Sequence, residues 1–133
     1  MDIVWDESFS VNDETIDRQH KRLIDMIHTA CMVRQTDPAS EGISDLLAEL
    51  SKYAQKHFEY EEGYMKDIAF PDIEAHRSEH RMFKEKVARL CMDALSGKET
   101  VVADITDFLC KWALDHIGMI DQKYRRFADS HSV

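Results

Sequence analysis

Five histidines and one glutamate stand in line with apolar residues that repeat at helical spacing. His57 and Glu61 are four residues apart, as are His76 and His80, so each pair lies one helical turn apart on one face. Imidazole and carboxylate groups converging inside a protein are metal ligands. The full set is His20, His57, Glu61, His76, His80 and His116.

An apolar interior does not accommodate six such groups without a common partner. Each uncompensated buried polar group costs roughly 1–3 kcal/mol. The whole margin that keeps a domain folded is only roughly 5–15 kcal/mol. A single buried histidine is explained by one hydrogen bond, whereas this set indicates a shared metal site.

Asp121 is a further candidate ligand with an unusual offset. It stands five residues after His116, and a regular helix would rotate the two side chains apart. A local π-type widening, or a loosened last turn near Gly118, would bring them together. Taken alone, Asp121 would be interpreted as an exposed aspartate at a fraying helix end.

The apolar pattern predicts long helices that position these residues. Only 4 Gly and 2 Pro occur in 133 residues, too few turn-formers for a many-stranded β protein. Short breaks, one of them at Pro38, favour antiparallel neighbours, so we expect a single all-α domain, an up-down-up-down antiparallel four-helix bundle over residues 1–133. The expected elements are a non-helical N-terminal leader at 1–15 and helices at about 15–35, 41–68, 73–95 and 100–128.

Charge and composition exclude several classes of partner. Asp and Glu number 26 against 17 Lys and Arg, a formal charge of −9, which disfavours nucleic acid and anionic membrane surfaces. We find no apolar run near the roughly 18–20 residues of a membrane span, and the first residues lack a signal-peptide pattern. We therefore expect a soluble cytoplasmic protein, and a monomer.

The three cysteines, Cys31, Cys91 and Cys110, form no CxxC pair. An odd, dispersed set indicates a reducing compartment and not a disulfide framework. We expect them to be partly buried structural thiols.

The chain resembles the hemerythrin family, in particular single-domain bacteriohemerythrins. The combination His-x3-Glu, His-x3-His and His-x4-Asp on successive helices is specific, although each motif alone is weak. The resemblance covers nearly the whole chain. It is carried by Trp5-Asp6-Glu7-Ser8-Phe9-Ser10-Val11, Ile16-Asp17-Arg18-Gln19-His20, His57-Phe58-Glu59-Tyr60-Glu61-Glu62, His76 to His80, Trp112 to His116, Ile117, Asp121 and Tyr124.

The resemblance implies a non-haem site of two iron ions, oxo- or hydroxo-bridged, that binds O2 reversibly. In this family pattern, one iron is completed by His76, His80 and His116. The second iron is held by His20 and His57 and keeps an open position for O2. The two irons are bridged by Glu61 and Asp121.

The resemblance also implies a dry apolar O2 pocket. Its expected lining is Leu23, Phe58, Trp112, Ala113 and Ile117. Ala113 departs from the bulky leucine usual at that position, so we hypothesise easier entry of water, anions or peroxide and faster loss of the oxygenated form. Tyr124, one turn beyond Asp121, could donate a hydrogen bond to a bridging carboxylate or could simply pack.

These expectations leave more than one function open. We favour an O2 carrier, store or sensor whose partners are O2 or small anions, ahead of an enzyme. The alternative is a di-iron redox enzyme acting on peroxide or nitric oxide, although the Glu-x-x-His pairs of ferritin-like di-iron bundles are missing from the sequence. A structural zinc bundle is a third interpretation, and it would leave the two bridging carboxylates without a clear purpose.

Overall fold

Long helices make up most of this computed structural model, which describes residues 3–36 and 42–131. The expected break at Pro38 lies outside the described residues. None of the described helices is long and apolar enough to cross a membrane. The elements are η1 (Glu7–Phe9), α1 (Glu14–Thr36), α2 (Gly42–Asp67), α3 (Ile73–Leu95), α4 (Val101–Trp112), η2 (Ala113–Ile120) and α5 (Asp121–Ser130).

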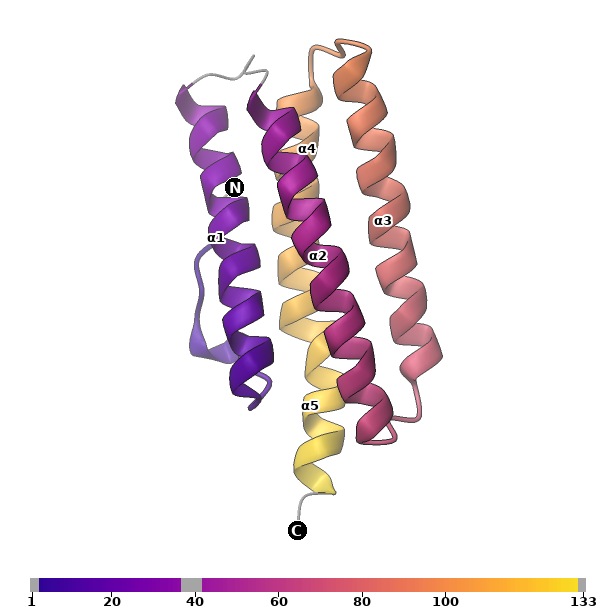
Figure 1. Cartoon of the computed structure of the whole chain (residues 1–133). Helices are drawn as coiled ribbons and strands as arrows, with labels where there is room; N and C mark the ends of the chain where they lie inside the picture. Colours follow the sequence, from indigo (N-terminus) through magenta and orange to yellow (C-terminus); the bar gives the residue numbers. More distant parts are fainter. Residues whose placement is uncertain (1–2, 37–41, 132–133) are drawn as a thin grey trace.

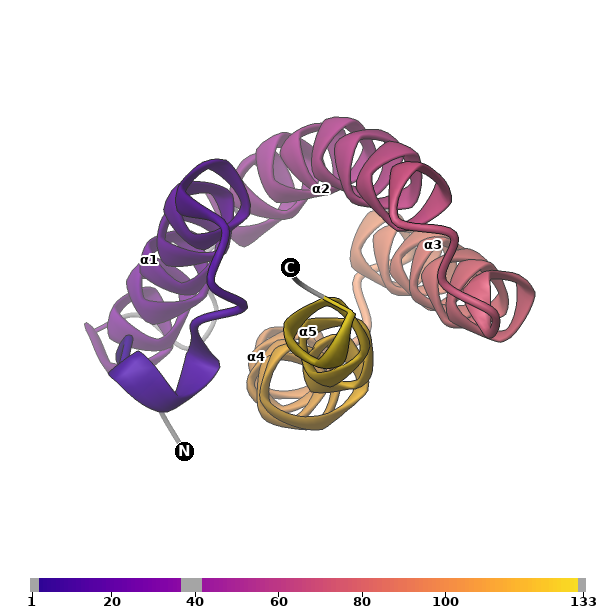
Figure 2. The same ribbon diagram turned by 90° about the horizontal axis from the view of Figure 1, so that it is seen from below.

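The elements form an all-α four-helix bundle, which confirms the predicted fold class (Figure 1). The last three elements, α4, η2 and α5, follow one another without a break and act as one fourth helix. Each helix packs against the next, and α4 also packs against α1. Figure 2 shows α1, α2 and α3 as an arc with the fourth helix on its inner side. The fourth helix therefore lies on the concave side of the arc, in contact with α1 and α3.

The third helix illustrates how the sequence sets these elements. Buried residues recur on α3 at gaps of three and four, which makes a single inward stripe. The helix ends in a Schellman motif, in which Gly97 N–H bonds Ala94 O and Lys98 N–H bonds Asp93 O. Gly97 has φ 76°, the left-handed conformation that glycine adopts without a steric penalty.

The candidate ligands lie between two apolar clusters stacked along the bundle. On α1, His20 stands between Ile16 of the smaller cluster and Leu23 of the larger one. On the other three helices too, the candidate ligands lie between residues that belong to, or pack against, the two clusters. Apolar side chains therefore cover the polar layer at both of its ends along the bundle. The smaller cluster includes Val11, Ile16, Met65, Phe70 and Tyr124, and the larger includes Leu23, Phe58, Phe83, Ala113 and Ile117.

The leader is tied across the side of the bundle. The Asp17 carboxylate accepts hydrogen bonds from Ser10 Oγ at 2.6 Å and from Val11 N–H at 2.8 Å. Gln122 Nε2 donates to Phe9 O at 3.2 Å, which joins the leader to the fourth helix. These bonds hold the buried Phe9 and Val11 side chains against the bundle.

Candidate metal centre

A π-helical segment in the fourth helix brings Asp121 next to His116. Residues Ala113–Ile120 form η2, and Asp121 N–H bonds the carbonyl of His116, five residues earlier. His116 Nε2 then lies 3.1 Å from Asp121 Oδ1. Of the two alternatives open from sequence, the π-type widening is confirmed. Gln122 Nε2 donates to Ile117 O at 3.2 Å and so satisfies a carbonyl within the widened turn.

All seven predicted ligands meet in the polar layer, and each is at most 3% exposed. His20 comes from α1, Glu61 and its neighbour one turn earlier from α2, and two histidines from α3. The fourth helix supplies the remaining pair. Every helix of the bundle therefore contributes, as the inward stripes predict.

The two oxygens of Glu61 face different histidines. Oε2 lies 3.2 Å from His20 Nε2 and 3.3 Å from His57 Nε2. Oε1 lies 3.1 Å from His76 Nε2 and 2.9 Å from His80 Nε2. The carboxylate thus stands between two sets of imidazole nitrogens.

Asp121 repeats this division. Its Oδ2 lies 3.1 Å from His20 Nε2, whereas Oδ1 lies 2.9 Å from His76 Nε2 and 3.1 Å from His116 Nε2. Two sets of potential ligands result, each of which could hold a metal ion with Glu61. We name them the two-histidine group (His20 and His57) and the three-histidine group (His76, His80 and His116).

Several ligand atoms are buried without a hydrogen bond in the described part of the chain. His57 Nε2, both ring nitrogens of His116 and both oxygens of Asp121 have no hydrogen-bond partner there. Their short separations therefore do not represent a satisfied hydrogen-bond network. Buried polar atoms left in this way are costly, and a metal ion placed among them would satisfy them. The donor set of imidazole and carboxylate fits iron.

Three histidines of the cluster have raised pKa values in the metal-free protein. Burial favours the neutral form of His20, His76 and His116, but contacts with Asp121 and Glu61 outweigh it and raise each pKa to about 9. Without metal, these histidines hold protons at neutral pH. A metal ion must displace those protons to bind.

The pKa values of Asp121, Glu61 and His57 are lowered instead. Burial and the Glu61 charge would raise the pKa of Asp121, but neighbouring histidines hold it far below its usual range. The pKa of Glu61 is likewise well below normal, because His57 and the other imidazoles outweigh burial. Both carboxylates are therefore ionised and can bind a cation. The pKa of His57, in turn, is lowered by burial.

The sequence did not predict the hydrogen bonds made by the second ring nitrogens of two candidate ligands. His57 Nδ1 donates to Gln19 Oε1 at 2.7 Å, and His80 Nδ1 donates to Glu62 Oε2 at 2.8 Å. Such acceptors fix the ring so that Nε2 faces the metal. The available signal was adjacency, because each acceptor is next in sequence to a predicted ligand.

Tyr124 makes the hydrogen bond that was one of its two possible roles. Its hydroxyl donates to Glu61 Oε2 at 2.9 Å, and the residue is fully buried. Burial, together with the Glu61 and Asp121 charges, holds its pKa well above normal, so the hydroxyl keeps its proton. Tyr124 therefore orients the carboxylate on the side of the two-histidine group.

The predicted pocket residues lie beside the histidine rings or in the larger apolar cluster. Phe58 stacks on His80 with ring centroids 3.9 Å apart, and Trp112 stacks on His116 at 5.0 Å. Leu23, Ala113 and Ile117 are completely buried in the larger cluster. Trp112 is half-buried.

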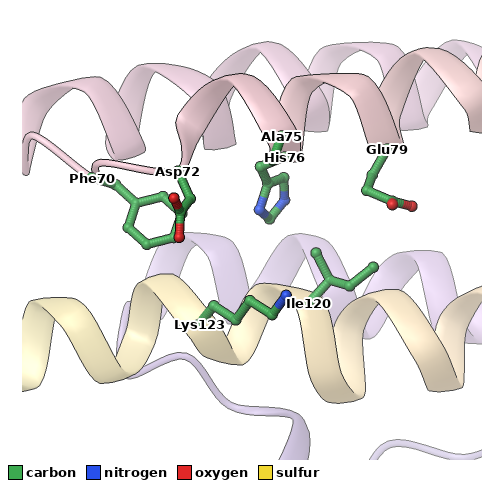
Figure 3. A pocket seen from close by; sticks show the side chains of 7 residues that line it. All are labelled: Phe70, Asp72, Ala75, His76, Glu79, Ile120 and Lys123. Carbon is green, nitrogen blue, oxygen red and sulfur yellow. The ribbon is translucent and has the colours of Figure 1, made fainter.

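Two surface pockets approach the three-histidine group. Figure 3 shows the His76 ring between α3 and the fourth helix, beside a pocket of about 120 Å³. A second pocket of about 310 Å³ reaches His116 and Trp112. Neither is lined by Ala113 or by the two-histidine group. The first pocket is lined by Phe70, Asp72, Ala75, His76, Glu79, Ile120 and Lys123.

Known proteins are similar to this chain in sequence over most of its length. A "Bacteriohemerythrin" of Stenotrophomonas maltophilia is 28% identical over 129 residues, which is 97% of this chain and 83% of the relative. A "Hemerythrin-like protein" of Naegleria gruberi is 30% identical over 121 residues, 91% of this chain and 89% of that protein.

Solved structures agree. A wild-type hemerythrin crystal structure superimposes with a TM-score of 0.82 at 30% identity, covering 93% of this chain and 95% of the other. A variant of it with one leucine replaced by alanine gives the same TM-score and coverage at 31% identity. The model of the Hemerythrin HHE cation binding domain matches residues 11–128. The match over most of the chain, the shared fold and the buried His/Glu cluster together show that this chain belongs to the hemerythrin family.

Proposed function

We propose that this protein binds O2 reversibly at a non-haem centre of two iron ions. One observation carries the proposal: Glu61 and Asp121 each direct one oxygen to the two-histidine group and the other to the three-histidine group. A carboxylate placed in this way is suited to bridging two cations. A single ion would not use both halves of the cluster.

The number of donors predicts where an external ligand would bind. Three imidazoles and one oxygen from each carboxylate give the three-histidine group five protein donors. The two-histidine group has only four, so a metal held there would keep room for an exogenous ligand. Structural zinc sites are typically closed with four protein ligands, and this larger, divided donor set favours iron. When bound, two ferrous ions would supply the electrons that O2 takes up.

The protein's own part is to keep water away from that position. Leu23, Phe58 and Ile117 are at most 1% exposed, and the larger apolar cluster covers this end of the site. A low-dielectric surrounding penalises separated charge. The enclosure therefore supports binding and release of a small neutral molecule over charge-separating turnover.

Ala113 is the residue that would tune this enclosure. It is completely buried in the larger apolar cluster, at a position where the resemblance leads us to expect a bulky leucine. We propose that Ala113 leaves extra space beside the O2 site.

We propose a role as carrier, store or sensor, in a soluble cytoplasmic monomer. The charge of −9 supports solubility. Turnover of peroxide or nitric oxide is the rival function, and the assay below separates the two.

The first test combines metal analysis with a substitution in one histidine group. Wild-type protein reconstituted anaerobically with Fe2+ should bind two irons per chain and develop a visible charge-transfer band with O2. His57→Ala should lose one iron and the band, while circular dichroism stays helical. Lys56→Ala, an exposed neighbour, is the matched control. Zinc as the metal of the protein as purified, or no iron bound after reconstitution, would overturn the proposal, and steady consumption of peroxide or nitric oxide would favour the enzyme.

A further inference from the structure

Two cysteines that are distant in sequence meet inside the bundle. Cys31 Sγ on α1 lies 3.3 Å from Cys110 Sγ on α4, across a separation of 79 residues. Both side chains are buried, at 3% and 0% exposure. Sulfur atoms at this distance are in direct contact. A disulfide requires a separation of about 2.05 Å, so the sulfurs would need to approach by about 1.3 Å.

The two thiols join the helices that hold opposite halves of the candidate metal centre. Cys31 lies on α1, which carries His20, and Cys110 lies six residues before His116. At 1.5 Å per residue, Cys110 is about 9 Å along the helix from that histidine. Both sulfurs belong to the larger apolar cluster that also contains Ala113.

We propose that Cys31 and Cys110 form a reversible oxidation site that reacts with hydrogen peroxide to give a disulfide between α1 and α4. This inference does not depend on the proposed O2 binding. Hydrogen peroxide is small and uncharged, so it can enter an apolar interior more readily than a charged oxidant. Contact between the sulfurs lets the second thiol capture the oxidised first one before further oxidation.

The reaction balances in two steps. One thiol sulfur attacks a peroxide oxygen, an S–O bond forms and the O–O bond breaks, and the departing hydroxide takes the thiol proton as water. The second sulfur then attacks the resulting sulfenic acid. The S–S bond forms, the S–O bond breaks, and a second water carries away the remaining proton. Two thiols lose two electrons in total, and one peroxide becomes two waters.

Cys91 provides an internal comparison. It lies on α3 and is only half-buried, so exposure alone would make it the first thiol to react. It has no second cysteine in contact with it among the hydrogen bonds found in the described residues, whereas Cys31 and Cys110 contact each other. If contact between thiols governs the outcome, the buried pair will form a bond while Cys91 remains a thiol.

The test is a peroxide titration of the full chain as purified, first reduced and freed of reductant. Thiols are alkylated under denaturing conditions, counted by mass spectrometry and mapped by proteolysis. We expect increasing peroxide to remove two of the three thiols and no more, and to yield a Cys31–Cys110 peptide that reductant separates. The oxidised protein should melt roughly 5–15 °C higher, because the bond closes a long loop.

Matched variants sharpen the assay. Cys91→Ala should form the same bond, whereas Cys31→Ala and Cys110→Ala should keep two alkylatable thiols and show no rise in melting temperature. Preferential oxidation of Cys91, a Cys91-linked dimer, or full alkylation of Cys31 and Cys110 after peroxide would overturn the inference. The mapping on the wild-type chain decides the question even if a variant fails to fold. Because the readout is thiol chemistry, its failure is distinguishable from failure of O2 binding.

Discussion

The contact between Glu62 and His80 offers a quantitative test of how the two proposed metal positions differ. His80 Nδ1 donates to Glu62 Oε2 at 2.8 Å, and Arg77 Nε donates to Glu62 Oε1 at 3.2 Å. Glu62 is 25% exposed, so its charge is only partly screened. Across the site, His57 has the neutral acceptor Gln19. Glu62 therefore acts on the three-histidine group alone.

Replacing Glu62 by glutamine keeps an acceptor and removes the charge. A hydrogen bond to a charged group contributes about 1.5–3 kcal/mol, and a neutral one is roughly half as strong. The expected loss is about 1–1.5 kcal/mol, which corresponds to roughly tenfold weaker metal binding. This lies at the lower end of the roughly 10–100-fold losses seen for outer partners of metal ligands.

The assay is metal release to a chromophoric chelator under anaerobic conditions. With two metals bound as proposed, Glu62→Gln should release one of them about tenfold more readily and leave the release of the other near its wild-type value. Glu59→Gln, an exposed substitution on the same helix, is the matched control. Wild-type release from Glu62→Gln, or equal weakening by the control, would refute the reasoning.

Two further predictions concern the pocket and the bound protons. Ala113→Leu should fill the proposed space at this buried position and slow loss of the oxygenated form several-fold. An unchanged autoxidation rate would contradict the pocket hypothesis. In metal-free protein, His20, His76 and His116 have folded pKa values of about 9 against about 6.5 unfolded. Their stabilisation is complete below about pH 6.5 and is lost as pH rises through 9, so the melting temperature should fall by roughly 5 °C or more over that range. Metal-loaded protein should lack this fall in a thermal scan, and identical pH profiles would be inconsistent with proton displacement.

The inward histidines were predictable because helical periodicity is a strong signal. A residue four positions from another on a helix shares its face, whatever the neighbouring helices do. His57 with Glu61, and His76 with His80, needed no knowledge of packing. The fold class followed from the same periodicity and from the short breaks between helices, and the structure confirms it.

Helical periodicity alone could not predict the position of Asp121 relative to His116. Its offset from His116 conflicts with a regular helix, and sequence left two ways of resolving the conflict. The structure resolves it with a π-helical segment whose carbonyl at Ile117 is satisfied by Gln122. That compensation depends on a side-chain conformation, which no spacing rule contains.

Side-chain contacts between helices could not be predicted from the sequence. Gln19 and Glu62 stand beside predicted ligands, but their hydrogen bonds depend on the axial positions of neighbouring helices. The approach of Cys31 to Cys110 depends on the same register. From the sequence we expected partly buried thiols, whereas this pair is fully buried, and the sequence could not indicate that the two sulfurs meet.

The central claim, reversible O2 binding at two irons, is tested most directly by an oxygenation cycle. The reduced, iron-loaded protein is titrated with O2, its visible spectrum is recorded, and the solution is then degassed. Reversible binding predicts one O2 for each pair of irons and a charge-transfer band that disappears on degassing and returns over repeated cycles. A band that decays to an oxidised form and does not return, or O2 uptake without any band, would contradict it.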